Sequence, residues 1–209
     1  MSGARRDSIV PIVPIVALLA LALSVLTACR PGRPAPPPLS TLPDFTLVER
    51  DGSTVRRTDL LGAPWVADFV FTRCIAYCPR LTARMKELRA RLPAEIRTVS
   101  FSVDPEHDTP AVLTEYARQW QIEGKSWLFL TGERAAVWSL VRKGFLLAVE
   151  EDPSSTGSNS AAPIVHSNRF VLVDSRGRMR SAVEAFDADA IERLLAELEA
   201  VRREEVRAR

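Results

Sequence analysis

The chain alternates between short apolar runs and segments in which apolar residues recur every three or four positions. The run at 65–71 has the length and the aromatic content of a buried strand. After it, Leu81, Met85 and Leu88 share one helical face, and Pro93 ends the helix. The whole pattern predicts strands at 45–50, 53–57, 65–71, 98–103, 127–130, 169–173 and after 177, and helices at 81–92, 109–120, 133–143 and from about 187.

Turn and capping residues mark the ends of these elements. Asp51 and Gly52 join the first two strands as a hairpin, and Thr109 followed by Pro110 begins a helix. Gly144 suits a C-terminal cap of the helix before it. Residues 153–163 have no periodicity, which predicts a mobile loop. Because strands alternate with helices, we expect an α/β fold built on βαβ units, with the opening hairpin as an addition.

The N-terminal segment has the form of an export signal. Arg5 and Arg6 precede an apolar run at 9–28 that leads to Cys29. The uninterrupted apolar part, 15–28, is shorter than the roughly 20 residues that a bilayer span needs. Its last three residues and the following Cys29 read Leu-Thr-Ala-Cys, which resembles the bacterial lipobox, in which the cysteine is acylated.

This segment sets the predicted organisation of the chain. We expect a signal peptide with a lipobox at 1–28, a proline-rich spacer at 29–40 that is anchored by lipid on Cys29, and a folded domain at 41–207. The alternative is an uncleaved anchor helix with an incidental cysteine. Either arrangement puts the domain at a membrane, on the extracytoplasmic (periplasmic) side in a bacterium.

Composition and charge narrow the classes of function. A chain of 209 residues leaves room for one domain, and 46% hydrophobic with 26% charged residues is typical of a globular protein. The net charge of +2 comes with arginines scattered along the chain and no basic stripe. This distribution predicts a mixed-charge solvated surface and argues against binding of nucleic acid.

The remaining two cysteines lie close together. Cys74 and Cys78 follow the strand at 65–71 and precede a helix, at the sheet edge where ligands usually bind. The positive end of a helix lowers the pKa of a thiol, and a spacing of four residues brings the two sulfurs to one helical face. The pair can therefore close a disulfide or bind one metal ion.

The chain has two histidines that could complete a metal site. His107 lies in a polar turn and is interpreted as an exposed loop residue. His166 would by itself be a surface or packed histidine, but the βα layout can bring its loop close to the cysteines. Two thiolates suit Cu(I) or zinc, and an added imidazole also suits Cu(II).

The segment around the cysteines, Phe-Thr-Arg-Cys-Ile-Ala-Tyr-Cys-Pro at 71–79, resembles the CxxxCP motif of the Sco/SenC family. The resemblance extends over residues 40–200, essentially the whole predicted domain. Agreement in order and spacing continues at 43–47, 102–105, 108–110, 127–132, 143–145, 166–167 and 174–177.

The resemblance implies a thioredoxin-like fold with a central mixed sheet, flanking helices and an added N-terminal β-hairpin. It implies a membrane-tethered copper chaperone that binds one copper ion, as Cu(I) or Cu(II), through Cys74, Cys78 and His166. The implied partner is the copper-accepting subunit of cytochrome c oxidase, whose CuA centre receives the metal. The resemblance also implies a second kind of partner, either another copper chaperone or a thiol reductase.

Two regions depart from the family pattern. Arg73 stands where many members have histidine, and Ile75, Ala76 and Tyr77 fill a space that often holds Pro-Asp. Val165 stands where an acidic residue often precedes the ligand histidine. None of these changes removes a ligand, but the charge of Arg73 would lower the pKa of the thiols and weaken cation binding.

Other uses of the cysteine pair stay open. In a thiol-disulfide oxidoreductase that reduces the oxidase subunit or another copper carrier, Cys74 would attack and Cys78 would resolve. Thioredoxin-type enzymes usually have CxxC and a proline directly before the late strand, whereas Pro163 is separated from that strand by His166. A peroxidase-like site would need a lone peroxidatic cysteine, and a stapling disulfide would gain little from so small a ring.

One carboxylate interrupts an apolar strand. Asp68 lies inside the run at 65–71, and a buried carboxylate needs a partner. The alternation of side chains is compatible with burial next to the cysteine site or with a position facing a polar helix.

Overall fold

The apolar runs pair into an eight-stranded sheet in the order β1-β10-β9-β4-β5-β6-β2-β3. The computed structural model describes residues 33–75, 77–151 and 164–208. The strands of this sheet are β1 (Ser40–Thr41), β2 (Thr46–Glu49), β3 (Thr54–Arg56), β4 (Trp65–Val70), β5 (Arg97–Ser102), β6 (Trp127–Thr131), β9 (Arg169–Val173) and β10 (Arg178–Glu184).

The middle of the sheet is parallel and its two sides are antiparallel. β4 pairs with β5 over six residue pairs, and β5 pairs with β6 over four. β9 and β10 extend the sheet on one side, and the β2–β3 hairpin joins it through β6 on the other. The predicted mixed sheet and opening hairpin are therefore confirmed, whereas the short strand β1 was not predicted.

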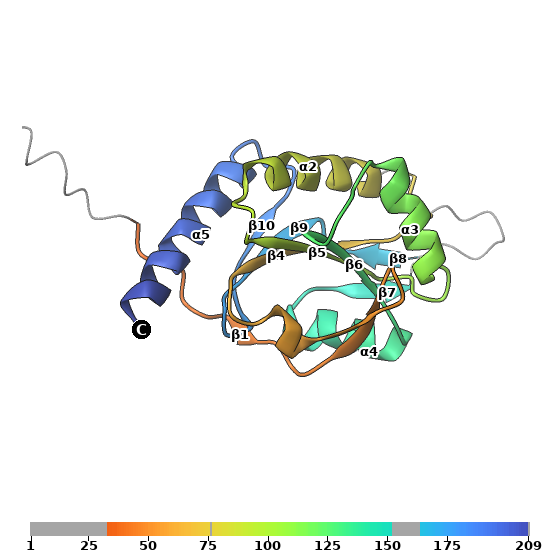
Figure 1. The fold of residues 1–209 in the computed structure, drawn as a ribbon, viewed down its shortest axis with the longest axis horizontal. Helices are drawn as coiled ribbons and strands as arrows, with labels where there is room; N and C mark the ends of the chain where they lie inside the picture. The colour runs from red at the N-terminus through yellow and green to blue at the C-terminus, as the bar shows by residue number, and fades with distance from the viewer. Residues whose placement is uncertain (1–32, 76, 152–163, 209) are drawn as a thin grey trace, which may run out of the picture. The chain divides into compact units, whose positions relative to one another are not determined.

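Helices cover both faces of this sheet (Figure 1). α2 (Tyr77–Arg91) and α5 (Ala190–Arg207) lie over one face, and α4 (Arg134–Ser139) lies over the other. α3 (Pro110–Gln119) is on the α2 side, because its Tyr116 hydroxyl hydrogen-bonds the Thr82 hydroxyl at 2.7 Å. A short 3-10 turn, η1 (Arg57–Leu60), follows the hairpin. The helix predicted to begin at Thr109 and Pro110 does so, and the Thr109 side chain caps it by accepting a hydrogen bond from the Val112 N–H.

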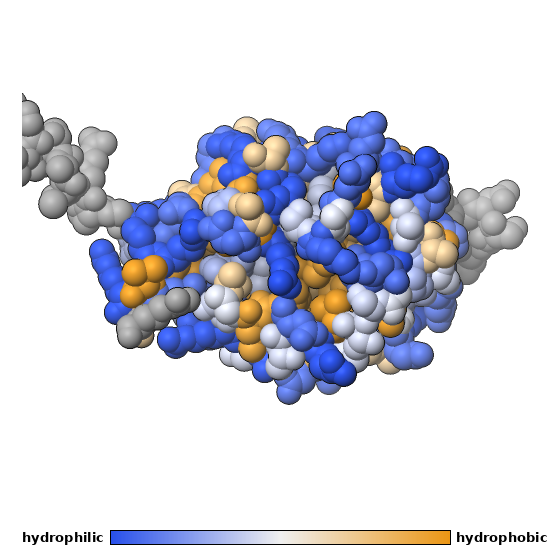
Figure 2. All heavy atoms as spheres, viewed as in Figure 1, coloured by the Kyte–Doolittle hydropathy of each residue, from blue (hydrophilic) through white to orange (hydrophobic). Residues whose placement is uncertain are grey.

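Polar side chains cover most of the face shown in Figure 2, with apolar patches between them. Arginines on the surface pair with acids of the same or a neighbouring element, as Arg118 does with Glu115 and Arg202 with Glu95. Exposed pairs of this kind contribute at most about 1 kcal/mol each. The arginines thus belong to a surface of mixed charge.

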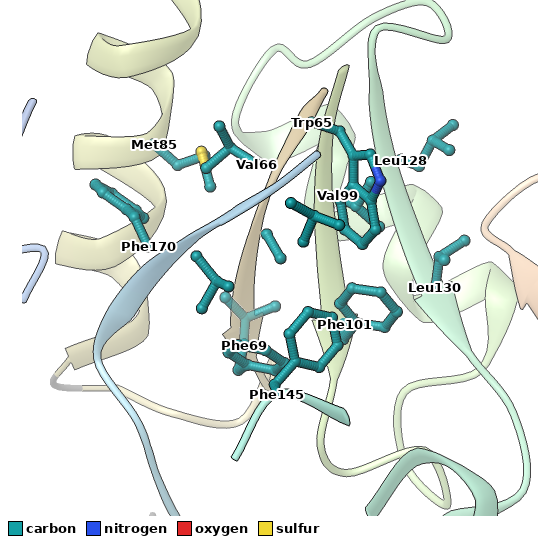
Figure 3. Close-up of a cluster of buried hydrophobic side chains, with 14 of the residues drawn as sticks. Trp65, Val66, Phe69, Met85, Val99, Phe101, Leu128, Leu130, Phe145 and Phe170 are labelled. Atoms are coloured by element: carbon teal, nitrogen blue, oxygen red, sulfur yellow. The ribbon is translucent and has the colours of Figure 1, made fainter. Parts of the chain in front are cut away.

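Aromatic rings fill the core on the α4 side of the sheet. The ring centroids of Phe69, Phe101 and Phe145 lie 5.0–5.8 Å apart, and Trp65 lies 6.2 Å from Phe101. Figure 3 shows these rings on one side of β4 and β5, whereas Val66 points to Met85 of α2 on the other side. Because neighbouring residues of a strand face opposite ways, β4 contributes to the core on both faces of the sheet.

The helix predicted at 133–143 changes its winding halfway. The α-helix α4 ends at Ser139, and the chain continues as a π-helical turn, η2 (Leu140–Gly144). A turn of this kind widens the helix by one residue, which hydropathy spacing at 3.6 residues per turn does not register.

Gly144 has a different role from the one predicted. It does not cap the helix in the left-handed conformation, since that conformation falls at Leu146, whose φ is 53°. Gly144 is instead surrounded closely: a Cβ atom on it would lie 2.9 Å from Pro43 Cδ and 3.0 Å from Leu140 Cδ1. The absence of a side chain lets η2 pack against the segment that precedes β2.

A second sheet of two strands carries the later histidine. β7 (Val149–Glu151) pairs antiparallel with β8 (Ile164–His166), so that Val149 lies opposite His166. This sheet was not predicted. The mobile loop predicted at 153–163 lies outside the described residues.

The first described residues are attached to the main sheet. The Leu39 N–H donates to the Met179 carbonyl at 2.8 Å, and Arg180 Nε donates to the Pro36 carbonyl at 2.7 Å. The predicted signal peptide and Cys29 lie outside the described residues. Among the helices that are described, none is long and apolar enough to cross a membrane.

We expect Gly144→Ala to lower the free energy of unfolding by about 1–3 kcal/mol, because the new methyl group has no room beside Pro43 and Leu140. Urea-induced unfolding measures the loss. Lys143→Ala, at the exposed neighbouring position, is the control and should stay within about 0.5 kcal/mol of wild type. Equal stabilities of the two variants would contradict the tight packing of Gly144.

Candidate metal centre

Cys74 lies in the loop after β4, and Cys78 is the second residue of α2. The Cys74 N–H donates to the Phe71 carbonyl at 3.2 Å, which turns the chain as it leaves the strand. Pro79 occupies the first turn of α2, where its missing N–H costs nothing. The Cys78 N–H donates to Cys74 Sγ at 3.3 Å, and no disulfide joins the two residues. The two thiols therefore lie together at the carboxyl edge of the parallel strands.

Both cysteines are shielded from solvent. Cys74 is 6% exposed and Cys78 is 0% exposed. The pKa of Cys78 is raised, first by its hydrogen bond with Cys74 and then by burial. The expectation that the helix N-terminus lowers the pKa is thus wrong for Cys78, because burial and the neighbouring thiol outweigh the helix dipole. Cys78 holds its proton firmly at neutral pH.

A buried carboxylate fixes the start of the cysteine loop. Asp108, which is 0% exposed, accepts hydrogen bonds from the Thr72 N–H at 3.1 Å and from the Thr72 hydroxyl at 2.5 Å. It also accepts one from the Ser102 hydroxyl at 2.6 Å. These bonds tie the end of β4 to the loop that follows β5, two residues before Cys74.

Asp104 holds the next residue of the same loop. Its Oδ2 accepts hydrogen bonds from Arg73 Nε at 2.9 Å and from the terminal Nη2 of the same side chain at 2.6 Å. The positive charge expected to weaken cation binding is therefore offset by a carboxylate. Arg73 remains partly open to solvent, with 43% of its side chain exposed.

The loop after β5, which carries Asp104 and Asp108, also carries His107. The side chain of His107 is 42% exposed, as predicted. Its Nδ1 lies 3.0 Å from Asp108 Oδ1, and possible ligand atoms of Asp104, His107 and Asp108 all lie within 4.8 Å of one another. Asp104 Oδ2 already accepts hydrogen bonds from Arg73, and both oxygens of Asp108 accept hydrogen bonds from Thr72 or Ser102. The group is therefore explained as an anchor for the cysteine loop.

Asp68, on β4, has no exposed surface. Within the described residues, neither of its carboxylate oxygens has a hydrogen-bond partner. Burial raises its pKa from 3.8 to about 7; the hydroxyl of Ser100, which lies opposite it on β5, is near enough to lower the pKa slightly although it does not reach full hydrogen-bond geometry. The negative charge of Asp68 in turn contributes to the raised pKa of Cys78.

His166 is located here by its backbone alone. It ends β8, in register with Val149, and its side chain is outside the described part of the structure. Ligation of a metal by His166 therefore stays a prediction. The same holds for the metal-binding roles of Cys74 and Cys78, whose closeness is observed.

Large apolar side chains remain exposed beside the cysteines. Ile75 is 79% exposed and Tyr77 is 54% exposed, whereas the cysteines that flank them are buried. An exposed apolar side chain has no energetic reason to face water, so this rim of Ile75 and Tyr77 is suited to contact with another molecule.

Sequence reasoning located the cysteines but missed the acids that surround them. Asp104 and Asp108 contributed only to the family resemblance, and their contact with the cysteine loop was not foreseen. A signal was available, because both follow the strand β5, whose carboxyl end lies next to that of β4 in a parallel sheet.

Known proteins are similar to this chain over most of its length. A family model described as SCO1/SenC matches residues 34–202. A SCO1 protein homolog of Bacillus subtilis (strain 168) is 34% identical over 139 residues, which cover 65% of this chain and 69% of the relative. A protein of Stutzerimonas stutzeri that is named for copper binding is 27% identical over 162 residues, covering 75% of this chain and 76% of the relative.

A solved structure gives the same result for the fold. BsSco, described as a member of the Sco family of cytochrome c oxidase assembly proteins with a disulfide switch, superposes with a TM-score of 0.70. It is 29% identical, and the match covers 81% of this chain and 98% of BsSco. The likeness confirms the predicted thioredoxin-like fold.

Removal of the Asp108 carboxylate should loosen the cysteine loop. We expect Asp108→Ala to lower the free energy of unfolding by about 2–4 kcal/mol, because the half-buried donors of Thr72 and the buried hydroxyl of Ser102 lose their acceptor. Asp104→Ala, whose partner Arg73 reaches solvent, should cost about 1 kcal/mol or less. Urea-induced unfolding compares the two, and equal losses would contradict the anchoring role of Asp108.

Stability should depend on pH through Asp68. Its pKa is higher in the folded chain than the ordinary value of 3.8, so the unfolded chain releases the proton first, and stability falls as pH rises toward about 7. Asp68→Asn removes this dependence. Its stability relative to wild type should increase by about 2–3 kcal/mol between about pH 5 and pH 8, measured by urea unfolding. If the difference in free energy of unfolding between the variant and wild type stays constant across that range, the pKa of Asp68 is not raised by folding.

Proposed function

This chain belongs to the SCO1/SenC family, and we propose on that premise that it is a copper chaperone tethered to a membrane. It binds one copper ion through Cys74, Cys78 and His166 and delivers the ion to the CuA centre during cytochrome c oxidase assembly. The observation that carries the proposal is the meeting of two thiols at the sheet edge, with the Cys78 N–H directed to Cys74 Sγ at 3.3 Å.

The donor set fits copper. Two thiolates are soft ligands that prefer Cu(I), and an imidazole as third ligand also accommodates Cu(II). Loading releases the protons of Cys74 and Cys78, since thiolates are the ligands. The nearby charges favour a cation, because Asp68 is close enough to affect the pKa of Cys78 and Asp104 offsets Arg73.

Transfer of copper requires contact with an acceptor. The exposed side chains of Ile75 and Tyr77 offer an apolar rim to the copper-accepting subunit of the oxidase. Burial of the sulfurs behind that rim keeps bound copper from solvent until the partner docks. Another copper chaperone or a thiol reductase would supply the metal or keep the pair reduced.

The proposed location is the extracytoplasmic face of a bacterial membrane. The export signal at 1–28 directs the domain there, and acylation of Cys29 anchors it. The proline-rich residues that follow act as a stiff spacer between the lipid and the domain.

A second candidate function is thiol-disulfide exchange, in which the pair reduces the cysteines of the oxidase subunit or of another copper carrier. The bond between the Cys78 N–H and Cys74 Sγ favours it, because that bond stabilises negative charge on the attacking sulfur. The two functions are alternative states of the same thiols.

Anaerobic titration of the reduced full-length chain with Cu(I), in competition with a chromophoric chelator, tests the three-ligand site. Wild type should bind one copper ion. Cys74→Ser and Cys78→Ser should lose tight binding, and His166→Ala should weaken it at least roughly 100-fold, because even supporting residues of metal sites are worth 10–100-fold.

His107→Ala is the matched control, since His107 is the other histidine of the chain. It should bind copper as wild type does. Binding by His166→Ala that equals wild type would remove His166 from the site. Disulfide reduction by a wild-type chain that binds no copper would favour the second candidate.

A further inference from the structure

Arg142 joins parts of the chain that no strand pairing of the main sheet connects. Its Nε and Nη2 both donate to the carbonyl oxygen of Val149 on β7, at 2.9 and 2.5 Å. Within residues 33–75, 77–151 and 164–208 no carboxylate pairs with Arg142, whereas Arg118 and Arg134 each pair with an acid. Hydrogen bonds from a charged donor are about twice as strong as those between neutral groups. The guanidinium of Arg142 thus directs two strong bonds to one main-chain atom.

That atom belongs to the residue that faces the predicted metal ligand. Val149 lies opposite His166 in the antiparallel pairing of β7 with β8. Opposite residues of such a pair have Cα atoms only about 4.5–5.5 Å apart. These two strands form a sheet separate from the main one, and a two-stranded sheet is marginally stable by itself. A bond that fixes Val149 therefore also fixes the backbone of His166.

Trp138 connects Arg142 to the loop after β5. The Arg142 Cζ atom lies over the indole ring of Trp138, 5.0 Å from its centre. The indole Nε1 donates to the Val103 carbonyl at 2.8 Å. The next residue, Asp104, accepts the hydrogen bonds of Arg73 in the cysteine loop. A continuous series of contacts therefore leads from β7 to the residue directly before Cys74.

A second arginine holds the same indole ring. Arg134, one helical turn before Trp138, places its Cζ atom 4.3 Å from the ring centre. Its Nη1 also lies 3.4 Å from Glu106 Oε2 in the loop after β5. An aromatic face attracts a guanidinium through the ring quadrupole. Contacts with Arg134, Arg142 and the Val103 carbonyl together restrict the indole to an orientation that satisfies all three.

The backbone around Arg142 departs from regular helix. Arg142 lies in the π-helical turn η2, which the Phe145 N–H closes by donating to the Leu140 carbonyl at 3.1 Å. Leu146 follows with a φ of 53°, a conformation that is unfavourable for a residue with a side chain. Single π-helical turns and strained residues occur frequently at functional sites. Here both lie between α4 and β7, where the chain enters the strand that Arg142 holds.

We propose that Arg142 is a positioning residue of the metal centre. It fixes the β7–β8 sheet, and with it the backbone of His166, relative to the loop that carries Cys74. It acts through the Val149 carbonyl on one side and through Trp138 on the other. The inference rests on the proposed function in taking His166 as the third copper ligand.

Hydrogen exchange in the reduced, copper-free full-length chain tests the hold of Arg142 on β7. Arg142→Ala should speed exchange of the amides at 149–151 and 164–166 at least roughly tenfold, because the Val149 carbonyl loses two charge-assisted hydrogen bonds. Amides of β4 and β5 should keep their wild-type rates. Mass spectrometry of peptic fragments measures both regions.

Arg118→Ala is the matched control for the exchange measurement. Arg118 is also an exposed arginine of a helix, but its partner Glu115 lies in the same helix. The control should leave exchange in both sheets at wild-type rates. Wild-type exchange at 149–151 and 164–166 in Arg142→Ala would overturn the inference.

Cu(I) competition titration of four chains shows whether Arg142 acts through His166. The chains are wild type, Arg142→Ala, His166→Ala and the double variant. Arg142→Ala should weaken binding at least roughly tenfold, as the loss of supporting residues of metal sites does. Removal of a positive charge would by itself strengthen cation binding, so the direction of the change separates positioning from charge. In the His166→Ala background, Arg142→Ala should have no further effect, because no third ligand remains to be positioned.

Equal weakening in both backgrounds would contradict the inference, because Arg142 would then support the fold in general. Wild-type affinity in Arg142→Ala, with weak binding in His166→Ala, would contradict it as well. If His166→Ala binds copper as wild type does, the proposed three-ligand site fails. The exchange rates at 149–151 and 164–166 then decide by themselves whether Arg142 holds the β7–β8 sheet in place.

Discussion

The parallel pairing of β4 with β5 is the constraint from which the cysteine site follows. Six residue pairs hold the two strands in register, so both end at the same edge of the sheet. The loop after β4 carries Cys74, and the loop after β5 carries Asp104 and Asp108, which accept hydrogen bonds from Arg73 and Thr72. Because these bonds reach the two residues directly before Cys74, the position of its sulfur depends on a loop more than thirty residues away in the sequence.

Burial gives the pair its chemical character. With both sulfurs shielded, the local dielectric is low, and protonation is decided by near neighbours more than by water. Cys78 keeps its proton through its bond to Cys74 and through burial, and the charge of Asp68 adds to this effect. In the proposed copper site, the metal ion would have to displace the protons that burial retains on the sulfurs.

The departures from the family pattern become understandable in this setting. Arg73, in place of the frequent histidine, is bound by Asp104 and brings little uncompensated charge to the thiols. Ile75 and Tyr77 widen the apolar rim around buried sulfurs. These residues alter the surface around the cysteines, and the Cys78 N–H still donates to Cys74 Sγ.

Local sequence by itself determined most strands and helices of the main sheet layer and the cysteine pair. Hydrophobic spacing, the Asp51-Gly52 turn and the Thr109-Pro110 helix start act over a few residues, so the chain order reveals them. Only the tertiary structure decided that Asp108 anchors Thr72, that Gly144 is small to admit Pro43, and that β8 pairs with β7. The alternation in β4 did not reveal which face of the sheet its even-numbered residues occupy, and only the structure shows Val66 pointing to Met85 of α2. These outcomes depend on contacts between distant segments, whose closeness is set by the folding of the whole domain and leaves no local period in the sequence.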